Sequence, residues 1–134
     1  MTGTLAWALH RAAGLFEWAG LDDCKYVSLN PVCVDGVISP SIAYQYLGRQ
    51  FEGLFFDLSA GLKPDALAAL AGCVGGGGLI CVYWGSSLKD HPMEAHLQVE
   101  GGVASEVGHR LRERLLSSAM ECAHFVMHEM SGDI

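Results

Sequence analysis

Residues 54–84, LFFDLSAGLKPDALAALAGCVGGGGLICVYW, decide the fold class, because they predict a strand, a helix and a second strand in succession. Residues 54–58 are apolar apart from Asp57, which is typical of a strand buried on both faces of a parallel sheet. A helix rich in Ala and Leu opens at Pro64 and extends to about Val74. The final six residues of the stretch predict another buried strand.

The sequence before this stretch adds a helix and a strand. Residues 4–19 carry apolar side chains at three- and four-residue steps, which predicts a helix with one apolar stripe. Trp7 and Trp18 fall on nearly the same side of that helix and predict a second buried face. Residues 24–29 are then typical of a short strand closed by an Asn-Pro pair.

Prolines and glycines mark the connections. Residues 32–39 are loop-like, and a helix is expected to start with Ser39 as N-cap and Pro40 at its first position. Gly48 is expected to end that helix. The four glycines at 75–78 follow a helix and precede a strand, the reverse of a phosphate-binding loop, so they predict a helix stop and a tight turn.

The sequence after residue 84 gives a weaker pattern. Residues 96–99 are a candidate edge strand, residues 103–115 predict a helix, and residues 121–129 predict a last strand. Because strands alternate with helices along the whole chain, we expect one α/β domain over residues 1–134, built around a mostly parallel sheet.

The composition narrows the class of protein. The chain has 134 residues, 51% of them hydrophobic, and a formal net charge of −7. Such a chain can bury a core, and its acidic balance argues against a free-standing DNA or RNA binder. No apolar run approaches the roughly 18 residues that a membrane span needs. The five cysteines are odd in number and form no C-x-x-C pair, which predicts reduced thiols in a cytoplasmic protein.

The best-placed candidate for ligand binding is the loop that follows the strand at 54–58. Asp57, Ser59 and Gly61 lie at the carboxyl end of that strand and precede a helix, the usual site position in open α/β sheets. Asp57 could hold a ribose hydroxyl or a cation. The alternative, which we favour, is that Asp57 and Ser59 hydrogen-bond the backbone of their own loop.

Other polar clusters carry less specific signals. Two sets of residues contain histidines. The first set is His91, Glu94 and His96, and the second is His124, His128 and Glu129. Neither set has the spacing of a helical zinc site, so no metal is predicted for either. The chain has one basic cluster, formed by Arg110, Arg112 and Arg114. It could touch RNA or an acidic partner, but such residues more commonly form a solvated helix face. No serine lies in a G-x-S-x-G elbow, so no catalytic residue is predicted.

The middle of the chain, residues 46–84, resembles the N-terminal domain of bacterial tRNA(Met) cytidine acetyltransferase, TmcA. The residues that carry the resemblance are Leu47-Gly48, Phe51, Asp57, Gly61-Leu62, Asp65-Ala66-Leu67, 69–72, Gly77-Gly78 and 79–82. The resemblance implies a three-layer, Rossmann-like sandwich with a sheet of about four to five strands. In that family the domain precedes helicase and acetyltransferase modules, which hold the ATP and acetyl-CoA sites, so no catalytic residue or cofactor carries over to this sequence.

The resemblance also gives the expected function. We expect a non-catalytic accessory or interaction domain in tRNA cytidine acetylation, which contacts tRNA only indirectly. The family usually has an apolar strand before position 2, and its loss would leave an open sheet edge or gap that a second copy or another protein could fill. The alternatives are a nucleotide- or cofactor-binding domain that uses the loop at 57–61, and weak tRNA binding through Arg110, Arg112 and Arg114.

Overall fold

A computed structural model of the chain describes residues 4–28, 36–59 and 63–84, together with residues 113, 114, 117, 118 and 121. Its strands are β1 (Cys24–Val27), β2 (Val37–Ile38), β3 (Phe51–Asp57) and β4 (Val74–Tyr83). Its helices are α1 (Leu5–Trp18), the 3₁₀ helix η1 (Pro40–Tyr46) and α2 (Pro64–Ala71). The four strands form one sheet in the order β2-β1-β3-β4, and every pair is parallel.

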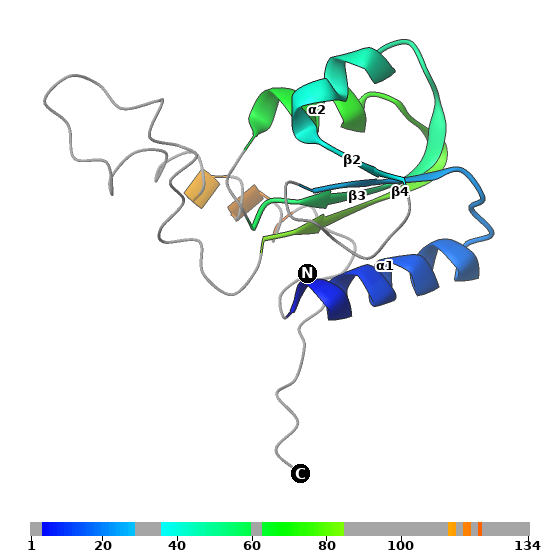
Figure 1. Cartoon of the computed structure of the whole chain (residues 1–134). Helices are drawn as coiled ribbons and strands as arrows, with labels where there is room; N and C mark the ends of the chain where they lie inside the picture. Colours follow the sequence, from blue (N-terminus) through cyan, green and yellow to red (C-terminus); the bar gives the residue numbers. More distant parts are fainter. Residues whose placement is uncertain are drawn as a thin grey trace, which may run out of the picture.

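The sheet lies between two helical layers (Figure 1). Helix α1 covers one face, whereas η1 (cyan) and α2 cover the other. The crossover through η1 joins β2 to β3, and the crossover through α2 joins β3 to β4, so both run in the same direction along the sheet. Crossovers of the same handedness that run in the same direction place their helices on the same face. The described residues therefore confirm the small, parallel, Rossmann-like α/β sandwich expected from the sequence.

Strand β3 is the centre of the core, as its apolar sequence predicts. Leu54 and Phe56 pack in the cluster under η1 and α2, and Phe55 packs in the cluster under α1. All three side chains are fully buried. Successive side chains of a strand point to opposite faces, so an unbroken apolar run supplies both halves of the core.

Helix α1 begins where the sequence predicts but has only one buried face. The hydroxyl of Thr4 caps it by accepting a hydrogen bond from the Trp7 amide (3.2 Å). The residues of its buried stripe are Ala8, Ala12 and Phe16. The predicted second buried face is wrong at Trp18, which is 84% exposed, whereas Trp7 is half-buried against the cluster under α1. A helix in an outer layer contacts the sheet along one stripe, and Trp18 lies off that stripe.

The segment before β3 differs from its prediction in two respects. The expected loop at 32–39 contains β2, whose two residues pair with Tyr26 and Val27 of β1. The following helix is a 3₁₀ helix, and Ser39 makes no side-chain capping bond, its hydroxyl lying 2.8 Å from the hydroxyl of Ser41. Gly48 follows the helix with φ = 83°, a left-handed conformation that suits glycine.

The four glycines at 75–78 are part of β4, so the predicted helix stop and turn are wrong. Helix α2 has already ended at Ala71, and the glycines form a bulge in the β3–β4 ladder. Phe51 pairs with Val74 but Gly53 pairs with Leu79, so the four glycines lie opposite the single residue Glu52. Strand β4 is also less buried than predicted, since Ile80 is 46% exposed.

The sequence beyond residue 84 is described only in part. Glu121 is helical, so the strand predicted at 121–129 does not begin there. The rest of that strand and the candidate edge strand at 96–99 lie outside the described residues. Residues 113 and 114 are helical, in agreement with the helix predicted at 103–115. Within the described ranges, no helix is long and apolar enough to cross a membrane.

Candidate functional site

The strand order reverses between β1 and β3 at the carboxyl edge of the sheet, the position at which open α/β sheets form a ligand crevice and which is here called the crevice position. The chain leaves β1 toward β2 on one side and later enters β3 on the other side. In open α/β sheets this reversal of strand order is where ligands usually bind. The residues at this position are Ser28, directly after β1, and Asp57, the last residue of β3.

The Asp57 carboxylate is held by protein donors. The Ser28 hydroxyl donates to Oδ2 (2.6 Å), and the Ser59 amide donates to Oδ1 (2.8 Å). Both Ser28 and Asp57 are buried, with 6% and 4% of their surfaces exposed. Buried polar groups require such partners, because an unsatisfied one costs about 1–3 kcal/mol. The contacts therefore fix the carboxyl ends of β1 and β3 and the start of the following loop.

Backbone contacts join the same edge to its neighbours. The Ser28 amide donates to the Ile38 carbonyl (3.1 Å), and the Leu58 amide donates to the Tyr83 carbonyl (2.6 Å). The ends of β1 and β2, and those of β3 and β4, are thus connected beyond their ladders.

The structure brings together two of the residues that the sequence singled out and adds a third. Asp57 and Ser59 meet, and Ser59 contributes its backbone amide. Sequence reasoning missed Ser28, although a polar residue at the end of an apolar strand was a usable signal. Gly61 lies outside the described residues.

Most residues of the basic cluster, and both histidine sets, lie outside the part of the chain that the structure describes. Arg114 is exposed on a helical segment. Arg110, Arg112 and both histidine sets lie outside the described ranges. Among the residues that are described, no group of three His, Cys, Asp or Glu side chains is arranged to hold a metal ion.

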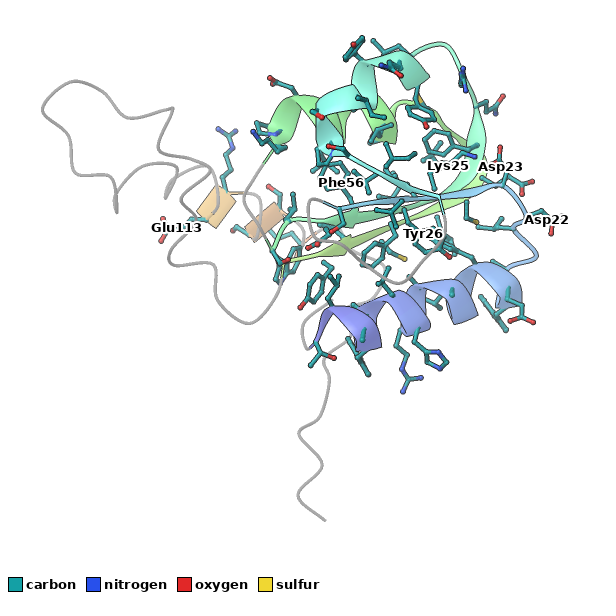
Figure 2. The ribbon with its side chains drawn as sticks, viewed as in Figure 1. Asp22, Asp23, Lys25, Tyr26, Phe56 and Glu113 are labelled. Atoms are coloured by element: carbon teal, nitrogen blue, oxygen red, sulfur yellow. The ribbon has the colours of Figure 1, made fainter. Side chains whose placement is uncertain are left out.

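A second feature lies at the opposite, amino edge of the sheet and was not anticipated. It is a groove of about 510 Å³, here called the amino-edge groove, lined by Leu21, Asp22, Asp23, Gln50, Phe51, Glu52 and the four glycines at 75–78. Glu52 Oε2 accepts hydrogen bonds from the amides of Asp22 (2.6 Å) and Asp23 (3.2 Å). An ion pair of 2.8 Å joins Asp23 to Lys25 (Figure 2).

The carboxylates of the amino-edge groove affect a neighbouring thiol. Burial raises the pKa of Cys24, and the negative charges of Glu52, Asp23 and Asp22 raise it further. Each of these influences disfavours the thiolate. The three carboxylates therefore act on Cys24 in the same direction as its burial.

Comparison with known proteins identifies the family. A model of the family described as tRNA(Met) cytidine acetyltransferase TmcA, N-terminal, matches residues 2–129. Neither the comparison with curated proteins nor the comparison with solved structures gave a match. The family match extends far beyond the stretch at 46–84 that carries the clearest motifs. The chain therefore belongs to the TmcA N-terminal family, which links it to tRNA cytidine acetylation.

Proposed function

We propose that this domain is a non-catalytic accessory domain that acts by docking to a protein in tRNA cytidine acetylation. The observation that supports this proposal most directly is the engagement of Asp57. It is the acidic side chain best placed for chemistry at the crevice position, and both of its oxygens accept hydrogen bonds from the protein. A group used in this way stabilises the fold.

A ligand at the crevice position would have to compete with these internal contacts. A ribose hydroxyl bound to Asp57 would have to share the buried carboxylate with the Ser28 hydroxyl and the Ser59 amide, or displace one of them and leave it in need of a new partner. The net charge of −7 also favours a protein partner over direct contact with tRNA phosphates. The partner in this proposal is another protein or a second copy of the chain.

One observation favours a second candidate, a nucleotide- or cofactor-binding domain. The hydrogen-bonded set of Ser28, Asp57 and Ser59 lies at the reversal of strand order, where related architectures bind ligands. In this alternative the loop after β3 would carry the ligand contacts.

A thermal-shift measurement with Asp57→Asn separates the two candidates. The protein is titrated with ATP, S-adenosylmethionine and acetyl-CoA, and each midpoint is compared with that of the same variant without ligand. The accessory proposal expects no ligand-dependent shift in the unchanged chain. Asp57→Asn itself should lower the free energy of unfolding by about 1–3 kcal/mol, because one oxygen becomes a donor facing a buried donor.

Asp65→Asn is the matched control, since Asp65 is an exposed aspartate in the first turn of α2. It removes the same charge and should leave ligand responses unchanged. Stabilisation by one of the three compounds that persists in Asp65→Asn and disappears in Asp57→Asn would overturn the accessory proposal in favour of ligand binding.

A further inference from the structure

The amino-edge groove lies where three helical segments lead into strands. The segments after α1, η1 and α2 enter β1, β3 and β4 at this edge. In Figure 2, Asp22 and Asp23 lie on the side of the molecule away from Glu113. If the domain docks to another protein, as proposed above, this groove is the candidate for the docking surface, and its charges and apolar residues indicate what kind of segment it binds.

The charge around the groove is predominantly negative. All of its charged lining residues are acidic, namely Asp22, Asp23 and Glu52. Helices α1 and α2 end at this edge, and neither has a basic residue in its last turn to offset the negative end of its dipole. Two cations lie close in sequence: Lys25 is paired with Asp23, and Arg49 stacks 5.4 Å from the Tyr46 ring centre.

Two exposed apolar residues lie close in sequence to the lining of the groove. Trp18 is 84% exposed and Leu47 is 60% exposed. Each lies three residues before a lining residue, Leu21 or Gln50, so their Cα atoms are within about 11 Å of the lining. Exposed tryptophan beside a groove is typical of the anchor positions of protein interfaces.

The glycine bulge leaves one wall of the groove without side chains. At Gly76 and Gly77 a Cβ atom would meet nothing within 4 Å, so the backbone there is open to close approach. Gly75 and Gly78 are different, because a Cβ atom there would collide with Gln50 or with the Glu52 carbonyl. Gly75 and Gly78 therefore allow close packing against β3 and its preceding segment, whereas Gly76 and Gly77 leave room for a partner's backbone.

We propose that the amino-edge groove docks a basic segment of a partner protein, in which arginine or lysine alternates with apolar residues. The cations of that segment meet Asp22 and Glu52, and its apolar residues pack on Trp18. Charge complementarity selects this occupant, because all three charged residues that line the groove are acidic and α1 and α2 end at the same edge of the sheet.

The test uses a fluorescein-labelled peptide of alternating arginine and leucine and measures its anisotropy with the full chain. We expect saturable, salt-sensitive binding. Asp22→Asn removes a charge but keeps the amide that bonds Glu52, and it should weaken binding about threefold. Trp18→Ala should weaken it about tenfold, as loss of an anchor residue does. Both side chains are exposed, so neither change should alter the melting temperature by more than a few degrees.

Glu113→Gln is the matched control, because it removes one exposed charge on the far side of the molecule (Figure 2). Equal weakening in Asp22→Asn and Glu113→Gln, or an unchanged affinity in Trp18→Ala, would overturn the proposal. So would a dimer in light scattering that Trp18→Ala dissociates, since the occupant would then be a second copy. None of these outcomes depends on the titrations with ATP, S-adenosylmethionine and acetyl-CoA. The proposal for the amino-edge groove and the proposal of an accessory role can therefore be overturned independently.

Discussion

Cys81 shows how burial controls a titratable residue in this core. Its side chain lies in β4 in the cluster under α1, and burial raises its pKa from 9.0 to about 11. Because the folded state favours the neutral thiol, Cys81 contributes stability that is complete below about pH 9. That contribution is lost as the pH rises from about 9 to about 11.

Replacement of Cys81 by alanine should remove this part of the pH dependence. The unchanged chain should lose about 2–3 kcal/mol more free energy of unfolding between pH 9 and 11 than Cys81→Ala does. Urea unfolding at several pH values, followed by tryptophan fluorescence, measures the difference. Cys24 and Tyr26 also have raised pKa values but are present in both proteins, so parallel pH profiles would contradict the role assigned to Cys81.

At the crevice position, the sequence was sufficient to identify Asp57 but not its partner. An acidic residue at the end of an apolar strand is visible without a structure, and its bond to the Ser59 amide is the loop-organising role that we favoured. Ser28 is 29 residues away from Asp57, and only the pairing of β1 with β3 brings them together. Patterns within one segment do not specify which strands are neighbours.

Among the elements, the glycine bulge gives the clearest test of a backbone requirement. Gly77 has φ = 83°, whereas Gly76 is outside the left-handed region and is equally free of neighbours. Gly77→Ala should therefore lower the free energy of unfolding by about 1–2 kcal/mol, because Cβ disfavours that conformation. Gly76→Ala should be neutral or slightly stabilising. Chemical denaturation of both variants makes the comparison, and equal losses would argue against a left-handed Gly77.

Long periodic or apolar elements could be predicted, as could the short strand β1, but β2 and the glycine bulge could not. α1, β3 and α2 appear where their patterns placed them. β2 has only two residues and therefore no periodicity to detect. The bulge in β4 depends on its register with β3, and the exposure of Trp18 depends on which stripe of α1 meets the sheet. Tertiary contacts determine β2, the bulge and the exposure of Trp18, and a pattern within one segment does not contain them.

For the whole molecule, the charge predicts weak contact with nucleic acid. Because the chain has eight Lys and Arg residues against fifteen Asp and Glu residues, it should not retain tRNA(Met) on a filter, even at about 50 mM salt. Filter binding at about 50 and about 200 mM salt measures retention. Salt-sensitive retention that falls when Arg110, Arg112 and Arg114 are all changed to alanine would show direct tRNA binding and contradict this expectation.

The strand order also constrains how the protein folds as it leaves the ribosome. β1 pairs through two residues with β2 but through four with β3, so its first extended ladder requires a strand that ends at Asp57. A nascent chain that stops before β3 contains α1, β1, β2 and η1, but its only strand pairing is the two-residue one between β1 and β2. Once β3 has been made, the sheet can close around β1 and then grow outward to β4 in the order of synthesis.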